Sequence, residues 1–157
     1  MGNKTFADLG VFNVAFNHAA TLTCSRHGIR EDNITASKGQ PNDVYTVNIF
    51  SDKVIMRITC PHITNYQGKL SDINGITVFL PLDGRKETRI NFLWCIGEIG
   101  IATGAIQKVS EISAFLKFLG VQNSLDKDRA RNSIEINGLK YGYITVKNIG
   151  CTFYVTK

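Results

Sequence analysis

Hydrophobic and polar residues alternate in short runs along much of the chain, and turn-forming residues separate these runs. Residues 44–50 and 53–60 are one such pair, with Ser51 and Asp52 between them as a suitable two-residue turn. Both runs are rich in β-branched side chains, which are stiff at χ1 and suit the pleated surface of a strand. The pattern predicts a β-hairpin over residues 44–60.

Residues 75–82 and 87–96 form a similar pair on either side of a short turn segment. Alternate residues from 88 to 96 are apolar or β-branched, and this alternation predicts a second hairpin. A helix over residues 87–96 is the alternative, because apolar residues also recur there at helical spacing. Gly97 and Gly100 follow directly, and we expect a bend at these glycines before the next element.

Apolar residues recur at spacings of three and four between residues 106 and 119, which is the period of one helix face. The residues of this stripe are Ile106, Val109, Ile112, Phe115, Leu116 and Leu119. Thr103 is a suitable N-cap, and Gly120 is a suitable stop. We therefore expect one amphipathic helix over residues 104–119, with its apolar face packed on a sheet.

The C-terminal segment has the strongest hairpin signal of the chain. Asn137 and Gly138 separate residues 134–136 from residues 139–146, and Asn-Gly favours the turn type that matches the twist of paired strands. After a further turn, residues 151–156 form another β-branched and aromatic run. We expect a three-stranded meander here.

The remaining segments are less regular. Residues 1–24 fit either a strand or a helix, and residues 25–43 are polar and contain glycine, proline and asparagine, which predicts a long loop. The whole pattern predicts an α+β fold, namely a mainly antiparallel sheet of seven or eight strands in hairpins with one helix near 104–119. Composition agrees, since Ile, Thr and Val number 18, 13 and 10. A chain of this length predicts one globular domain over residues 1–157.

Charge and targeting signals say little about partners. The formal net charge of +5 comes from 18 lysines and arginines against 13 aspartates and glutamates. Spread over roughly 7,900 Å² of surface, this charge is too dilute to identify a nucleic-acid-binding protein. The N-terminus has no signal-peptide core or lipidation motif, and the purest apolar run, residues 92–96, is too short to span a bilayer. We expect a cytoplasmic protein without a membrane partner.

Two Cys–His pairs raise the question of a metal site. Cys24 and His27 form one pair, Cys60 and His62 form the other, and four such ligands would satisfy tetrahedral zinc. The spacing within the second pair is unusual for zinc, and nothing fixes the position of the first. Separate thiols and surface imidazoles are the simpler interpretation, so we expect no cofactor.

Enzyme motifs are largely missing from the chain. His62-Ile63-Thr64 has the form of one half of a two-histidine phosphoesterase site, with His62 as acid or base and Thr64 beside it. Such enzymes need two of these units, and this chain has one. A phosphoesterase using this unit is therefore an alternative hypothesis, and a protein without catalytic activity is the favoured one.

Cations and aromatic residues are interleaved near the C-terminus. The residues of this group are Lys140, Tyr141, Tyr143, Lys147, Tyr154 and Lys157. Aromatic stacking with phosphate neutralisation is how β-surfaces bind single strands, so a single-stranded nucleic-acid-binding protein is a second alternative. Tyr141 and Tyr143 would share one face of a strand, and packing on the core explains them equally well.

By elimination, we expect a non-catalytic binding or assembly module that uses a β-sheet surface. Sheet surfaces and edges pair readily with other chains. An inhibitor, an adaptor, or a viral or phage-type assembly component would fit this description by analogy of class. The expected partner is another protein or a second copy of this chain.

Overall fold

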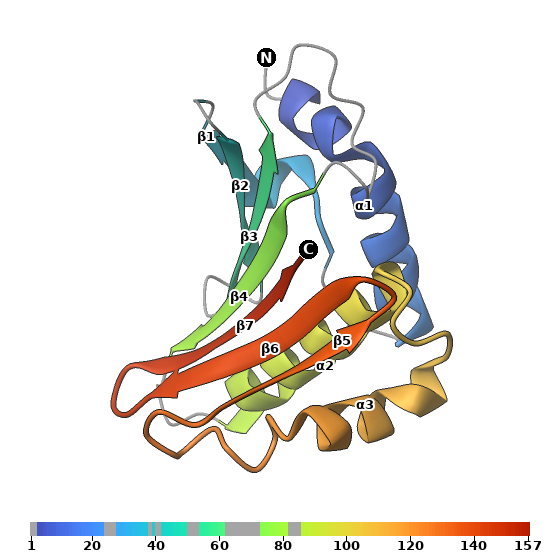
Figure 1. The fold of residues 1–157 in the computed structure, drawn as a ribbon. Helices are drawn as coiled ribbons and strands as arrows, with labels where there is room; N and C mark the ends of the chain where they lie inside the picture. Colours follow the sequence, from blue (N-terminus) through green and yellow to red (C-terminus); the bar gives the residue numbers. More distant parts are fainter. Residues whose placement is uncertain are drawn as a thin grey trace.

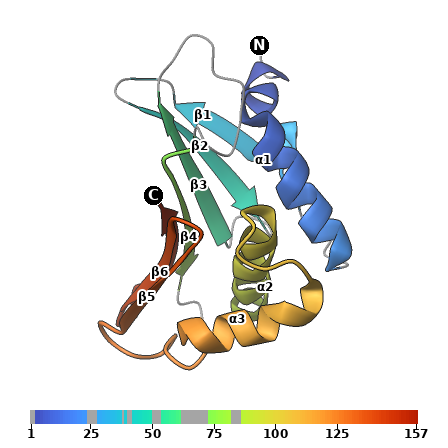
Figure 2. The same cartoon turned by 45° about the vertical axis from the view of Figure 1, so that its right-hand side comes forward.

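A computed structural model describes residues 3–23, 28–37, 39, 42–49, 54–61, 73–81 and 86–157. In this part of the chain, seven antiparallel strands form one sheet and three α-helices lie on one side of it (Figures 1 and 2). The α+β fold with a mainly antiparallel sheet is confirmed. The strands are β1 (Ile34–Ser37), β2 (Asn42–Ile49), β3 (Val54–Pro61), β4 (Gly75–Pro81), β5 (Arg131–Ile136), β6 (Leu139–Val146) and β7 (Gly150–Thr156). The helices are α1 (Asn3–Leu22), α2 (Lys86–Ala102) and α3 (Ile112–Leu119), with 3₁₀ turns η1 (Glu31–Asn33) and η3 (Val109–Glu111).

The strand order is β1-β2-β3-β4-β7-β6-β5, so β4 and β7 join two meanders that are distant in sequence. The two paired strands of the hairpin predicted over residues 44–60 are confirmed as β2 and β3, and its predicted turn at Ser51 and Asp52 lies outside the described residues. The predicted C-terminal meander is confirmed as β5, β6 and β7. Asn137 and Gly138 have φ of 53° and 82°. Positive φ at both positions is what a type I′ turn requires, and it explains why Asn-Gly stands there.

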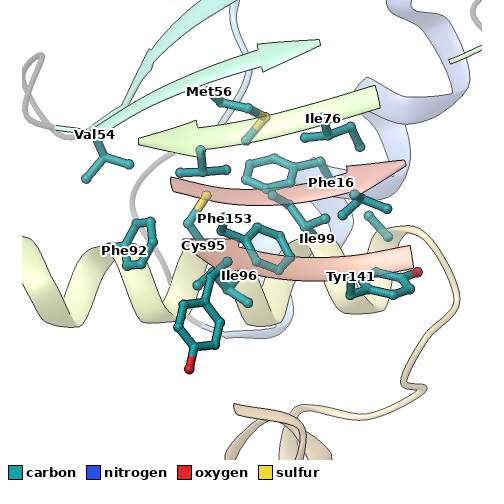
Figure 3. Close-up of a cluster of buried hydrophobic side chains, with 14 of the residues drawn as sticks. Phe16, Val54, Met56, Ile76, Phe92, Cys95, Ile96, Ile99, Tyr141 and Phe153 are labelled. Atoms are coloured by element: carbon teal, nitrogen blue, oxygen red, sulfur yellow. The ribbon is translucent and has the colours of Figure 1, made fainter. Parts of the chain in front are cut away.

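The three helices divide the sheet between them. α1 contacts β1, α2 contacts β3 and β4, and α3 contacts β5, while α2 packs against both other helices. Figure 3 shows the main core, in which Phe92, Cys95 and Ile99 of α2 meet side chains of the central strands such as Met56 and Phe153. The helix layer and the sheet therefore share one continuous apolar core.

The prediction of a hairpin strand over residues 87–96 was wrong. These residues lie in α2, and β4 pairs with β3 and β7 instead. Residues 95–100 are all buried, so this part of α2 has no exposed face. A helix segment that is buried on all sides gives no amphipathic pattern in the sequence.

The bend expected at residues 97–100 is also absent, because both glycines lie inside α2. A methyl group at Gly97 would stand 2.6 Å from the side chain of Ile112, and one at Gly100 would stand 3.2 Å from Phe115. The glycines therefore allow α3 to approach α2 closely. This packing offsets the low helix propensity of glycine, which is about 1 kcal/mol per residue.

The helix expected over residues 104–119 is shorter than predicted. It begins with η3, continues as α3, and ends at Gly120, where φ is 83°. Thr103 does not cap it. The Thr103 hydroxyl instead donates to the carbonyl of Ile99 at 2.7 Å, and Thr103 belongs to the C-terminal turn of α2.

Two N-terminal segments complete the fold. The helix α1 resolves the alternative left open for residues 1–24. The long loop predicted for residues 25–43 was wrong in part, since η1 and the edge strand β1 lie within it. Asn17 of α1 holds this segment, because its side-chain amide donates to the Ile29 carbonyl at 3.0 Å and accepts from the Ile29 N–H at 2.8 Å. None of the helices in the described ranges is long and apolar enough to cross a membrane.

Candidate binding surface

The two faces of the sheet have different surroundings. Side chains on one face are buried beneath the helices, and we name this the covered face. Its central members are Tyr45, Val47, Met56, Ile58, Ile76, Val78, Tyr141, Tyr143, Phe153 and Val155. Successive side chains of a strand point to opposite faces, so the intervening residues form a second face, which we name the open face. No described helix packs on the open face (Figure 2).

A row of directly opposed residues crosses the whole open face at its centre. From β1 to β5 it runs Thr35, Thr46, Arg57, Thr77, Tyr154, Gly142 and Ser133. Arg57 and Tyr154 lie on either side of Thr77 in this row, two strands apart. The row thus places a cation and an aromatic ring among threonine and serine side chains at the middle of this surface.

The ring of Tyr154 lies across Gly142 of the neighbouring strand. A methyl group at Gly142 would overlap the end of the phenol ring and would lie 3.0 Å from the carbonyl oxygen of Asn132. Phe79 behaves similarly on the same face, because its ring tip lies 3.0 Å from the position of a methyl group on Gly150. Both aromatic side chains therefore lean over glycines of adjacent strands.

Charged groups on the open face are few. Arg57, Arg131 and Lys140 are exposed cations, and Glu135 is an exposed anion directly opposite Lys140. Partly exposed apolar residues stand between them, including Ile55, Phe79 and the 42% exposed Ile144. The described part of this surface is consequently weakly basic and mixed in polarity.

The six residues of the predicted nucleic-acid site do not share one surface. Lys140 and Tyr154 lie on the open face, and Lys147 is exposed in the turn between β6 and β7. Lys157 is exposed beyond the end of β7. Tyr141 and Tyr143 lie on the covered face and are 0% and 4% exposed. The structure brings Lys140 and Tyr154 together on one face and separates the two other tyrosines from them.

The two buried tyrosines are tied to the helix layer. The Tyr141 hydroxyl is hydrogen-bonded to Thr103 at 2.7 Å, and its ring meets Phe115 edge-on at 5.7 Å between centroids. Burial raises the pKa of Tyr141, and its hydrogen bond with Thr103 opposes this only in part. Tyr143 donates to Ser124 at 3.0 Å. These contacts satisfy the phenol oxygens inside the core, as buried polar groups require.

The sequence interpretation missed Arg57 and Phe79 as members of the open face. Arg57 is the one charged residue within β3, and its neighbours Met56 and Ile58 point into the core. A charge at an outward position of a central strand was the signal available for it. Phe79 gave no such signal, because an aromatic residue in an apolar strand is equally compatible with either face.

Most of the proposed zinc and phosphoesterase residues lie outside the described residues. These are Cys24, His27, His62 and Thr64, so both hypotheses stay untested. Cys60 is described, and it is fully buried. Within the described ranges, no three His, Cys, Asp or Glu side chains form a group that could hold a metal ion.

The other described cysteines are also buried thiols. Burial raises the pKa of Cys151 to about 12. Burial, together with the negative charge of Glu98, raises the pKa of Cys95 well above its usual value. The Glu98 carboxylate is itself buried and accepts a hydrogen bond from the Thr23 hydroxyl at 2.8 Å. High thiol pKa values disfavour the thiolate, so neither Cys95 nor Cys151 is a suitable nucleophile.

A groove of about 390 Å³ lies on the helix layer between α2 and α3. Its walls include Leu93 and Trp94 of α2 and Ile112 and Leu116 of α3. Trp94 is 39% exposed at this site. Apolar side chains make up most of the groove lining, and Ser110, Ser113 and Gln122 add polar groups to it.

Comparison with known proteins adds no family to this description. No protein-family model, no curated protein and no solved structure matches the chain.

Proposed function

We propose that the chain is a non-catalytic binding module that docks another protein on the open face of its sheet. The observation that carries this proposal is the central row, in which Arg57 and Tyr154 flank Thr77 on a face that no described helix covers. Arginine and tyrosine are among the residue types that contribute most binding energy in protein interfaces.

The composition of the open face supports a protein partner. Threonines and partly exposed apolar residues surround the row, and the described charges are limited to three cations and Glu135. The centres of protein interfaces are depleted in charge and enriched in aromatic residues and arginine.

Site-specific photo-crosslinking tests the proposed surface. A photoreactive amino acid is placed at Thr77 on the open face and, as a matched control, at Lys117, which is exposed on α3. In cells of the source organism, we expect a defined protein adduct from position 77 and none from position 117. An adduct from position 117 alone would place the binding surface on the helices and contradict the proposal.

Once the partner is identified, alanine variants measure the contribution of the row. We expect Arg57→Ala and Tyr154→Ala each to weaken binding by about tenfold or more, because truncating a central anchor costs on the order of 1–2 kcal/mol or more. Lys147→Ala, which removes an exposed charge away from the row, serves as the control. Unchanged affinity in both row variants would exclude this face as the site.

A single-stranded nucleic acid is the second candidate ligand, and the position of Tyr154 favours it. The ring lies over Gly142 on the open face, with Lys140 and Arg57 on the same face. An aromatic ring that lies along a sheet surface is suited to stacking with a base, and nearby cations are suited to phosphates. This candidate uses Lys140 and Tyr154 of the predicted group and leaves out the buried Tyr141 and Tyr143.

Fluorescence anisotropy with a labelled oligo(dT) distinguishes this candidate. We expect affinity to fall steeply between about 50 and 200 mM salt, and Tyr154→Ala to weaken binding by roughly fivefold or more. Tyr154→Phe keeps a stacking ring and is the matched control. No binding even at the lower salt concentration would remove nucleic acid from consideration and leave the protein partner.

A further inference from the structure

The strand β5 is the last strand at its end of the sheet, and in the described part of the chain only β6 pairs with it. The Thr145 N–H donates to the Ala130 carbonyl at 2.9 Å, which turns the backbone groups of Ala130 toward β6. Backbone groups alternate in direction along an antiparallel strand. Those of Arg131, Ser133 and Glu135 therefore point away from the sheet, where they can pair with another strand.

The side chains of β5 are self-complementary. Arg131 and Glu135 are exposed on the open face and stand two residues before and two residues after Ser133. If two copies of β5 pair antiparallel about Ser133, each Arg131 lies directly opposite Glu135 of the other copy. This register uses all three outward-pointing residues, and it joins opposite charges at both ends.

The helix layer carries an exposed aromatic residue on the side of the molecule where β5 lies. Phe118 of α3 is 73% exposed. The Ser113 flank of α3 lines the groove against α2, and the helical rotation of about 100° per residue places Phe118 on the opposite flank. The Asn132 side chain donates to the Leu119 carbonyl at 2.8 Å, which fixes this end of α3 beside β5. Phe118 thus lies toward the β5 edge of the molecule.

We propose that β5 pairs with β5 of a second copy around a two-fold axis at Ser133, so that one sheet continues across two chains. The arrangement satisfies the outward backbone groups, forms two Arg131–Glu135 ion pairs and brings the Phe118 side chains of both copies to the joint. Because it uses an edge, it leaves the open face of both copies accessible. It goes beyond the proposed function and does not depend on it.

The mass of the full chain in solution tests this pairing, by sedimentation equilibrium over a range of concentrations. We expect a dimer for the unmodified chain. Arg131→Glu and Glu135→Arg each place like charges opposite one another, and we expect each to weaken dimerisation by about tenfold or more. The double variant R131E/E135R restores opposite charges across the axis, and we expect it to recover most of the dimer affinity.

Two further variants separate loss of pairing from loss of folding. Ser133→Pro removes an outward-pointing N–H. The monomer tolerates this change because β5 is an edge strand, but pairing with a second copy needs that N–H. We expect a folded monomer by circular dichroism and sedimentation. Lys147→Glu reverses an exposed charge away from β5 and should leave the dimer intact. A monomeric unmodified chain, or a dimer that neither Ser133→Pro nor the single charge reversals weaken, would overturn the proposal while leaving the open-face experiments unaffected.

Discussion

Neighbouring residues of the same strands build the two faces of the sheet, yet the faces differ in chemistry. On β7, Phe153 is fully buried beneath the helices, whereas Tyr154 lies on the open face over Gly142. On β6, Tyr141 is buried and bonded to Thr103, whereas the adjacent Lys140 is exposed. Aromatic residue type alone therefore says little about role in this protein, because the side of the strand decides whether a ring stabilises the core or is available to a partner.

The two faces also differ in the hydrogen-bond partners of their hydroxyl groups. On the covered face, the hydroxyl groups of Tyr141 and Tyr143 are hydrogen-bonded to Thr103 and Ser124, and this offsets the cost of removing them from water. On the open face, threonine side chains can bond to solvent or to a partner. A ligand can therefore replace water on the open face. On the covered face, contacts with the helices have already replaced water.

Alanine substitution of two adjacent residues gives the largest expected contrast between the faces. We expect Phe153→Ala to lower the free energy of unfolding by about 3–5 kcal/mol, since it leaves a cavity in the core. Tyr154→Ala, on the open face, should lower it by about 1 kcal/mol. Urea unfolding followed by circular dichroism measures both. Equal losses in the two variants would show that the faces are not energetically distinct.

A methyl group at Gly142 tests the close contact on the open face. We expect Gly142→Ala to lower the free energy of unfolding by about 1–3 kcal/mol, because the methyl overlaps the Tyr154 ring. In the Tyr154→Ala background the cost should be smaller, although the Asn132 carbonyl still crowds the site. Gly39→Ala is the control, since no described atom lies within 4 Å of the added methyl. An unchanged cost in the two backgrounds would argue against the ring lying over Gly142.

The smallest effect is expected away from both faces, at the ion pair between Arg89 and Asp126. Arg89 Nη1 donates to Asp126 Oδ2 at 2.9 Å, and this bond holds the pKa of Asp126 below its usual value of 3.8. A lowered pKa in the folded state means that the pair stabilises the fold above about pH 4 and that this contribution is lost as the pH falls through the lowered pKa. Arg89→Gln should return the pKa toward 3.8 in a carboxyl NMR titration. A pKa that does not move would assign the shift to another group.

The parts of the fold that the sequence predicted well are those with a strong local signal. The turn at Asn137-Gly138 sets the register of β5 and β6, and the β-branched runs on either side of residues 50–53 form the β2–β3 hairpin. The stripe ending at Gly120 forms η3 and α3. In each case, the preference of the local backbone and the final structure agree.

The predictions that failed concern segments whose secondary structure depends on tertiary contacts. Residues 87–96 have the composition of a strand, but they form part of α2 because burying the apolar side chains of this helix against the sheet outweighs local propensity. The strand β1 lies in a segment whose sequence predicts a loop. Its backbone hydrogen bonds come from pairing with β2, and the short sequence of β1 gives no sign of that pairing. Local pattern carries no information about which surface is available to cover a segment.

The residues of the candidate surface were likewise predicted in part from the sequence and decided in part by tertiary contacts. By itself, the sequence determined a β-rich α+β protein with cations and tyrosines near its C-terminus, because composition and turn residues act locally. Only the tertiary structure decided that Tyr141 and Tyr143 belong to the core while Tyr154, Phe79 and Arg57 belong to the open face. The reason is physical: alternation along a strand separates neighbours onto two faces, but the packing of α1, α2 and α3 determines which face is withdrawn from water.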